Sequence, residues 1–145
     1  MPIQPKKLTL YLAGPLFSLA EQMFNNALAT ELRHIGYDVF VPQEFCNNEI
    51  SSKKIAERCK SFLHKADAVI VNLDGADTDS GTAFEAGMAC DRKTTIGFRT
   101  DIRQSGDDAQ YGTNSIFRLL HSVIHYNGNE ISELVSRIDV ALHTK

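Results

Sequence analysis

The stretch Ala68-Val-Ile-Val-Asn-Leu73, continued by Asp74-Gly-Ala-Asp-Thr-Asp79-Ser-Gly81-Thr-Ala-Phe-Glu85-Ala-Gly87, decides the fold. Its first part is an almost continuous apolar run, which is typical of a strand buried on both faces in a parallel sheet. Its second part is a polar loop that leads, from Gly81 onward, into a helix. The spacing therefore places Asp79 and Glu85 at the carboxyl end of a strand, where open α/β sheets bind their ligands.

Two interpretations of these carboxylates stay open. In the first, Thr82-Ala-Phe-Glu85 is a capping box and Asp79 or Ser80 is an ordinary helix cap. In the second, Glu85 is a nucleophile and Asp79 positions the substrate. Asp74 and Asp77 crowd the same strand exit, so that more negative charge gathers there than one helix start needs. This excess favours the catalytic interpretation, because neighbouring carboxylates raise one another's pKa. Such clusters occur mainly where the carboxylates have a function or a cationic partner.

Segments typical of strands and helices alternate along the chain. The predicted strands are 8–13, 39–41, 68–73, 94–98 and 122–126, and the predicted helices are 18–34, 50–65, 81–91 and 132–143, with a short helical segment at 114–120 and a long polar loop over 99–112. This alternation predicts one domain over residues 1–145 of the α/β class. We expect a flavodoxin-like, doubly wound parallel sheet of five strands in the order 2-1-3-4-5.

In that strand order the ligand crevice lies at the ends of the first and third strands. The turn Gly14-Pro-Leu-Phe17 is then expected to face the segment from Asp79 to Glu85 across one shared pocket. The turn contains no GxGxxG pattern, and the chain contains no GxxxxGK[ST] pattern. These absences argue against a dinucleotide site and against P-loop chemistry.

Composition excludes several other classes of function. The 18 acidic and 15 basic residues give a net charge of -3, which offers no basic surface for a nucleic acid polymer. No apolar stretch approaches the roughly 20 residues that cross a bilayer, and no signal-type segment opens the chain, so we expect a cytoplasmic protein without a membrane partner. Cys46, Cys59 and Cys90 show no CxxC spacing and the five histidines are scattered, so we expect reduced thiols and neither a metal nor a cofactor.

Four motifs, taken in order, resemble the nucleoside 2-deoxyribosyltransferase family: Tyr11-Leu-Ala-Gly-Pro-Leu-Phe17, Val39-Phe-Val-Pro42, Ala66-Asp-Ala-Val-Ile-Val71 and, above all, Asp79-Ser-Gly-Thr-Ala-Phe-Glu85-Ala-Gly87. The resemblance implies that Glu85 attacks the anomeric carbon of a deoxynucleoside and that Asp79 binds the sugar hydroxyls. It implies transfer of the 2-deoxyribosyl group to a free nucleobase through a glutamyl ester, in nucleotide salvage, with hydrolysis as a side reaction. The nearby helix N-terminus should favour the ionised form of Glu85, and Asp79 should oppose it.

The resemblance also implies roles for residues outside that motif. Tyr11 matches a tyrosine that orients the glutamate, and Phe17 matches an aromatic that flanks the base. The alternative for Tyr11 is a residue that only packs at a strand end. The alternative for Phe17 is an ordinary apolar residue at the start of a helix. Gln43 is placed to hydrogen-bond a base edge. Gly14 and Gly81, in the two facing segments, are further candidate substrate-binding positions.

Asn114 resembles an asparagine that family members extend into a neighbouring subunit's active site, which implies a homo-oligomer, at least a dimer. The family commonly has Asn-Leu-Met where this chain has Asn114-Ser-Ile116. A second departure is Cys59, at a substrate-binding position where the best-known members carry an aspartate that protonates the leaving base. Because a thiol is a poor acid, Asp79, Glu44 and water are the alternative sources of that proton.

Two other functions share this fold. A nucleoside 5'-monophosphate N-glycosidase typically carries a Gly-Gly-Arg turn after the first strand, which is absent here, although Arg99 and Arg103 offer guanidinium groups for a phosphate. A non-catalytic nucleotide-sensing module would not need both Asp79 and Glu85. Deoxyribosyl transfer is therefore the favoured interpretation.

Overall fold

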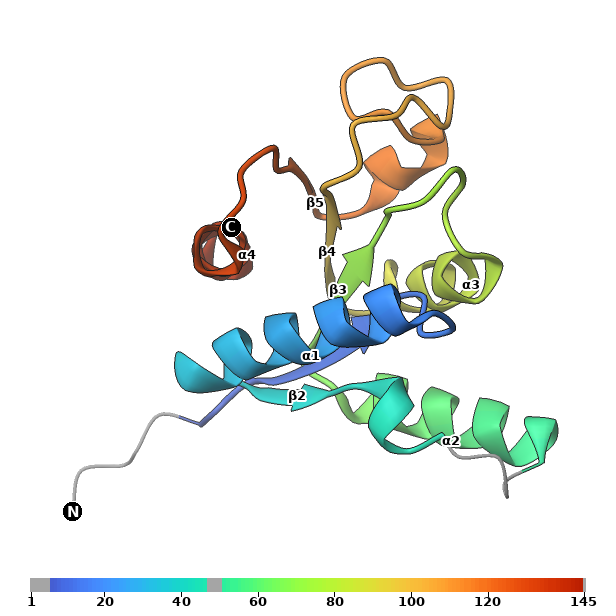
Figure 1. Ribbon diagram of the computed structural model, residues 1–145. Coiled ribbons are helices and arrows are strands. Elements are labelled where there is room, and N and C mark those ends of the chain that lie inside the picture. Colours follow the sequence, from blue (N-terminus) through green and yellow to red (C-terminus); the bar gives the residue numbers. More distant parts are fainter. Residues whose placement is uncertain (1–5, 47–50, 145) are drawn as a thin grey trace.

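The computed structural model describes residues 6–46 and 51–144. Its centre is a parallel sheet in the order β2-β1-β3-β4-β5 (Figure 1). The strands are β1 (Thr9–Ala13), β2 (Asp38–Phe40), β3 (Ala68–Asn72), β4 (Thr94–Arg99) and β5 (Ser122–His125). The predicted flavodoxin-like sheet and its strand order are thus confirmed.

Helices cover both faces of the sheet. On one face α1 (Leu19–His34) packs beside α4 (Ile131–His143), and on the other α2 (Ser52–Lys65) packs beside α3 (Ser80–Ala89) (Figure 1). Two short 3-10 helices, η1 (Pro42–Glu44) and η2 (Ser115–Leu119), follow β2 and precede β5. The predicted boundaries agree with these to within about three residues, η1 was not predicted, and Ile50, the expected start of the second helix, lies outside the described residues.

Alternation along β1 decides which residues meet which helices. Successive side chains of a strand point to opposite faces of the sheet. Leu10 and Leu12 belong to the apolar core under α1 and α4, whereas Tyr11 and Ala13 belong to the core under α2 and α3. Tyr11 is therefore directed toward the helix that carries Glu85.

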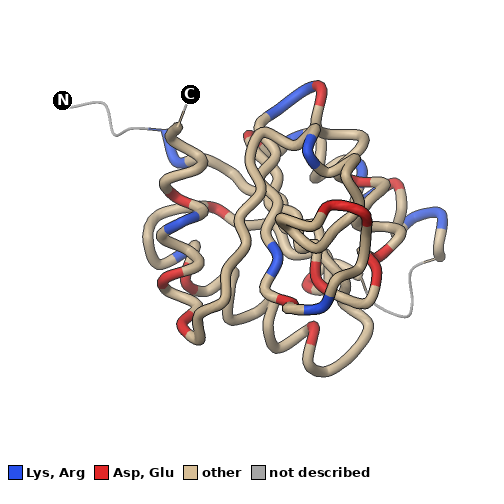
Figure 2. The backbone as a smooth tube through the Cα atoms, turned by 90° about the horizontal axis from the view of Figure 1, so that it is seen from above, with Lys and Arg blue, Asp and Glu red and all other residues tan. Residues whose placement is uncertain are grey.

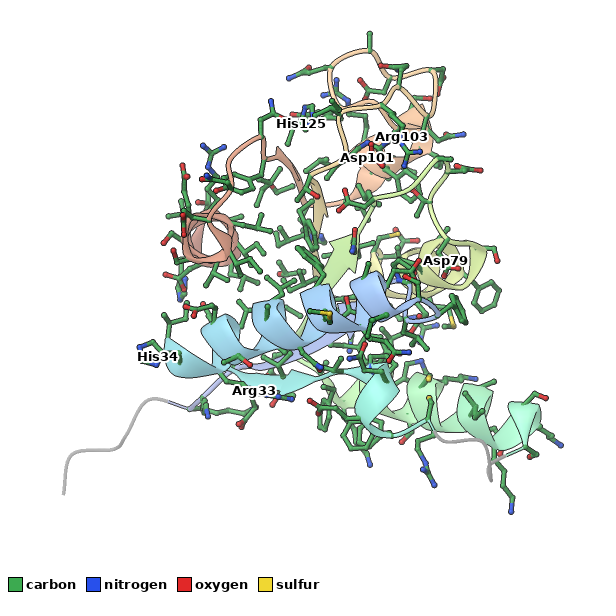
Figure 3. The ribbon with its side chains drawn as sticks, viewed as in Figure 1. Arg33, His34, Asp79, Asp101, Arg103 and His125 are labelled. Carbon is green, nitrogen blue, oxygen red and sulfur yellow. The ribbon has the colours of Figure 1, made fainter. Side chains whose placement is uncertain are left out.

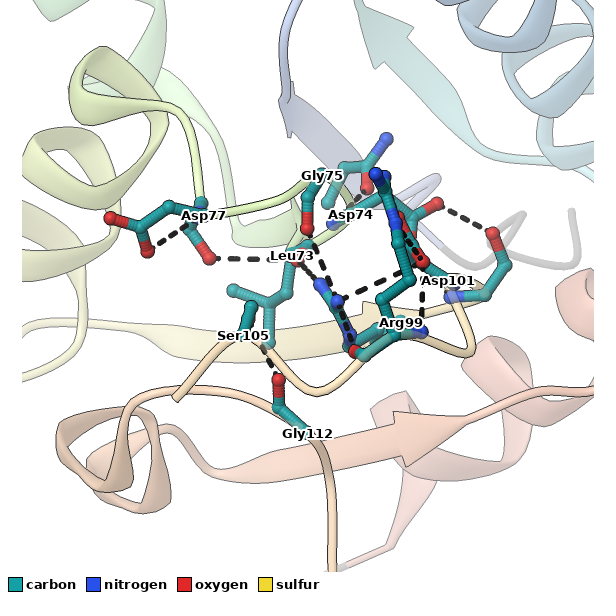
Figure 4. A network of polar contacts seen from close by, with 12 residues as sticks. Leu73, Asp74, Gly75, Asp77, Arg99, Asp101, Ser105 and Gly112 are labelled. Carbon is teal, nitrogen blue, oxygen red and sulfur yellow. Dashed lines mark hydrogen bonds and ion pairs between the residues drawn. The ribbon is translucent and has the colours of Figure 1, made fainter. Parts of the chain in front are cut away.

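A buried arginine joins the loops that leave β3 and β4 at the carboxyl edge of the sheet (Figure 4). The Arg99 side chain is fully buried. It donates hydrogen bonds to the carbonyl oxygens of Leu73 (2.5 Å), Gly75 (3.1 Å) and Arg103 (2.7 Å). The long polar loop after β4 is consequently anchored to the strand exit on which the acidic residues lie.

Charged residues of both signs are spread along the described part of the chain. Figure 2 shows Lys and Arg positions interspersed with Asp and Glu positions along the chain. Within residues 6–46 and 51–144, no helix combines the length and the apolar character needed to span a membrane. The same residues bring together no group of three or more His, Cys, Asp or Glu side chains able to hold a metal ion.

Candidate active site

Two of the four carboxylates at the β3 exit serve the loop itself. Asp74 accepts hydrogen bonds from the amide (2.6 Å) and the hydroxyl (2.5 Å) of Thr100, and so joins the β3 and β4 loops. Asp77 accepts from the amide of Thr78 (2.9 Å). The presence of Asp74 and Asp77 at this strand exit therefore has a structural cause.

Asp79 is the N-cap of α3, and Figure 3 places it at the start of that helix. Its Oδ2 accepts hydrogen bonds from the amide and the hydroxyl of Thr82, both at 2.9 Å. The capping interpretation thus holds for Asp79. It does not hold for Glu85, which lies further along α3 and makes no hydrogen bond to the cap among the described residues.

Glu85 differs from the other three carboxylates at the β3 exit in its hydrogen bonding. Its Oε2 is buried and has no hydrogen-bond partner of standard geometry among the described residues. Burial raises the pKa of Glu85 to about 7, with a contribution from the charge of Asp79, while the neighbouring Tyr11 hydroxyl lowers it. Near neutral pH both the protonated and the ionised form of this carboxyl group are therefore populated.

Two neutral groups lie beside Glu85. Tyr11 is 1% exposed, and burial together with the Glu85 carboxylate raises its pKa, which keeps the phenol protonated. Cys59, on α2, has a pKa raised to about 11, mainly by burial, so it is a thiol rather than a thiolate near neutral pH. The phenol can donate to the carboxylate.

A pocket of about 480 Å³ opens between α2 and α3 and includes Glu85. This volume is typical of sites for small molecules. The lining residues are Ala56, Glu57, Cys59 and Lys60 from α2, and Gly81, Phe84, Glu85 and Met88 from α3. A larger hollow of about 760 Å³ between β5 and α4 shares no residue with this pocket and has no carboxylate in its lining.

The turn after β1 lines a different hollow. Pro15 contributes to a space of about 340 Å³ beside α1, together with Asn72 and Asp74. The single shared pocket expected from topology is therefore divided in the structure. The physical reason is that the β1 turn leads into α1, on the opposite face of the sheet from α2 and α3.

Several predicted binding residues lie outside the Glu85 pocket. Phe17 is 76% exposed. A Cβ on Gly14 would approach the Cβ of Asn72 to 3.1 Å, so its glycine is explained by the close passage of two strand ends. Gln43 donates to the carbonyl of Gln22 (3.0 Å), and its amide is thereby held against α1 rather than free for a base edge.

Asn114 and Glu44 also have local partners. Asn114 caps η2 by accepting from the amide of Ile116 (2.9 Å). Glu44 accepts from both terminal nitrogens of Arg33 (3.0 and 2.9 Å). The structure therefore brings together Tyr11, Cys59, Asp79, Gly81 and Glu85, and leaves Gly14, Phe17, Gln43 and Asn114 outside the pocket.

Some residues of the region were not predicted from the sequence. Phe84 and Met88 share the pocket with Glu85, and the helical spacing of 81, 84, 85 and 88 was the signal for them. Asn25 is 3% exposed, and its Oδ1 is buried without a partner among the described residues. The sequence signal for Asn25 was its position as a polar residue on the apolar face of α1, in line with Leu28 and Leu32.

Comparison with known proteins places this geometry among relatives. The family model described as nucleoside 2-deoxyribosyltransferase matches residues 10–116. An uncharacterised protein of Ureaplasma parvum is 32% identical over 96 residues, which span 57% of this chain and 59% of that protein. The match thus covers less than two thirds of that relative.

Three solved structures share the fold. A conserved protein from Enterococcus faecalis is 25% identical with a TM-score of 0.76, covering 93% of this chain and 99% of that one. A 2-deoxyribosyltransferase from Bacillus psychrosaccharolyticus is 22% identical with a TM-score of 0.64, covering 88% and 90%. A CMP N-glycosidase from Clostridium botulinum is 19% identical with a TM-score of 0.63, covering 91% and 98%. Since the family model matches most of the chain, from β1 to η2, this protein belongs to the nucleoside 2-deoxyribosyltransferase family.

Proposed function

We propose that this protein transfers a 2-deoxyribosyl group from one nucleobase to another, in nucleotide salvage, with Glu85 as the nucleophile. The observation that supports the proposal is that Oε2 of the Glu85 carboxylate is buried and lacks a hydrogen-bond partner among the described residues. At a strand exit where Asp74, Asp77 and Asp79 accept hydrogen bonds from the chain, Glu85 lines a pocket, and its Oε2 is buried and unpartnered among the described residues. A buried carboxylate without a partner is costly unless a ligand uses it.

The reaction follows from the chemistry of that group. The N-glycosidic bond breaks through an oxocarbenium-like state, and the ionised Glu85 captures the anomeric carbon as an ester. A second base then attacks the same carbon, which releases the carboxylate and forms the exchanged nucleoside. Water in place of the base gives free deoxyribose as a side product. Tyr11 orients the carboxylate, and Asp79 holds the sugar from the helix start.

We further propose that the active unit is at least a dimer, with Asn114 completing a neighbour's site. Large apolar side chains are exposed near the pocket on α3 and on η2: Phe84 is 69% exposed, Ile116 60% and Leu119 68%. A groove of about 180 Å³ separates the two elements and is lined mainly by apolar residues. A second copy of the chain would cover this surface, and sedimentation velocity of the purified protein tests it.

A nucleoside 5'-monophosphate N-glycosidase is the alternative within the same fold. It needs a cation for the phosphate, but Arg99 is buried with three carbonyl partners. Arg103 is paired with Asp101 at 2.6 Å. Both guanidinium groups named as phosphate ligands are therefore engaged, and an unphosphorylated nucleoside is favoured.

The test is a base-exchange assay with a deoxynucleoside and a different free base. The proposal expects the swapped nucleoside from the wild-type protein and its loss in Glu85→Gln. Glu31→Gln on α1 is the matched control, because it makes the same chemical change far from the pocket. Sugar release from a monophosphate alone would support the glycosidase, and binding without turnover would support a sensor. Either result would contradict transfer.

A further inference from the structure

The residues that line the Glu85 pocket offer a departing base both apolar and polar surfaces. Ala56, Phe84 and Met88 are apolar surfaces that suit a planar ring. The other side chains that line the pocket, besides Gly81, are Glu57, Cys59, Lys60 and Glu85 itself. If the sugar is captured by Glu85, as the proposed function holds, the base must leave along these walls.

Two carboxylic acids, Glu85 and Glu57, belong to the lining of that space. Glu85 is committed as the nucleophile and cannot protonate the base in the same step. Cys59 and Tyr11 belong to weakly acidic residue types, and burial raises the pKa of both groups further. Glu57 and Lys60 line the pocket and are exposed.

The two candidate acids outside the pocket, Asp79 and Glu44, accept hydrogen bonds from other residues. Asp79 accepts two hydrogen bonds from Thr82 through one oxygen. Glu44 accepts from Arg33 through both oxygens. Neither carboxylate lines the pocket. Among the described residues, a base that needs a proton in order to leave therefore finds no buried carboxylic acid in the lining besides Glu85, and Glu57 is exposed to solvent.

We propose that this pocket selects nucleosides whose base departs as an anion stabilised by ring carbonyls, such as uracil, over amino bases such as cytosine, and that Lys60 is a specificity-determining residue. The proposal rests on the proposed function and names its substrate class. Lys60 lines the same pocket and is exposed, and its flexible stem allows the ammonium group to meet negative charge on the leaving base.

The step balances without a proton. The bond between the anomeric carbon and the ring nitrogen breaks, and its electron pair stays on the nitrogen. The carboxylate of Glu85 forms the ester bond and becomes neutral, so its negative charge passes to the base. A uracil anion spreads this charge over two carbonyl groups. Cytosine has an amino group in place of one of these carbonyls, and its anion is correspondingly less stable.

The test compares base release from deoxyuridine, deoxycytidine and 5-halogenated deoxyuridines of increasing base acidity. We expect deoxyuridine to react faster than deoxycytidine by about 100-fold, the size of a contribution from a missing general acid. Within the halogenated series the rate should rise with the acidity of the base. These ratios are measured on one protein sample, so they do not depend on the folded fraction.

Three variants separate the parts of the proposal. Cys59→Asp adds an acid and should bring the ratio between the two donors toward one, whereas Cys59→Ser adds none and should leave the ratio unchanged. Lys60→Gln should slow deoxyuridine more than deoxycytidine. Lys53→Gln, on the same helix but outside the pocket, is its matched control and should change neither rate.

The outcomes that overturn this inference are distinct from those that overturn the proposed function. Release of both bases at similar rates, with no dependence on base acidity, would contradict the inference while leaving transfer intact. Selective loss of deoxycytidine turnover in Glu57→Gln would also contradict it, by assigning the acid to Glu57. If no donor reacts at all, the proposed function itself fails, and the substrate class proposed for it fails as well.

Discussion

The hydroxyl of Tyr11 on β1 faces the carboxylate of Glu85 on α3, and both groups are buried. The two influence each other in opposite senses. The carboxylate raises the pKa of the phenol, and the phenol lowers the pKa of the carboxylate. Asp79 acts from the start of the same helix and raises the pKa of Glu85. The ionisation of Glu85 near pH 7 is thus set by burial and by these two neighbours.

Tyr11→Phe should move the acid limb of the pH profile to higher pH. The variant removes the hydroxyl that stabilises the ionised form of Glu85, so a larger fraction of the carboxyl stays protonated at any given pH. We expect kcat/KM for base exchange to fall most at low pH and to recover toward alkaline pH. An unchanged profile with a uniformly lower rate would mean that Tyr11 acts only by packing.

Asp79→Asn should move the same limb to lower pH, because it removes the negative charge that disfavours ionisation of Glu85. Asparagine caps helices about as well as aspartate, so stability should change little. Asp79→Ala removes the cap and should lower the free energy of unfolding by about 1 kcal/mol. A limb that does not move in Asp79→Asn, measured by kcat/KM against pH, would contradict the electrostatic role.

Glu85→Gln should stabilise the folded protein in a pH-dependent way. The pKa of Glu85 is raised from an ordinary 4.5 to about 7 in the folded state. The folded state therefore binds the extra proton between these values, and wild-type stability falls as pH rises through that window. Above pH 7 the variant should gain up to about 3 kcal/mol relative to its difference at pH 4. Urea unfolding at both pH values checks this, and an equal difference at both would contradict the shift.

Arg99→Met should destabilise the protein by about 2–4 kcal/mol, because it leaves buried carbonyl groups of the two exit loops without donors. Arg103→Gln is the control, since Arg103 is exposed and paired at the surface with Asp101. Thermal unfolding measures both. A comparable effect of the two substitutions would show that the buried hydrogen bonds contribute little.

Much of the fold could be predicted from the sequence because its signals are local and periodic. The apolar run 68–73, the capping pattern at Ser18 and Glu21, and the alternation of elements specify β3, α1 and the strand order. The turn η1 was missed because its 3-10 geometry after Pro42 leaves no periodic signal.

The sequence patterns explain why some candidate site residues lie near one another. Glu85, Tyr11 and Cys59 lie together because alternation along β1 directs Tyr11 toward α2 and α3. Burial, the dominant influence on the pKa of Glu85, could not be read from the sequence, where the helix N-terminus and Asp79 were the visible charges. The partners of Gln43 also depend on tertiary packing against α1.

The most direct test of the account is whether Glu85 becomes covalently bound to the sugar during turnover. Protein quenched in acid while it processes a deoxynucleoside should gain the mass of one deoxyribosyl group, and peptide mapping should place that mass on Glu85. The gain should be absent in Glu85→Gln and present in Glu31→Gln. A sugar adduct on another residue, or base exchange that persists in Glu85→Gln, would contradict the account.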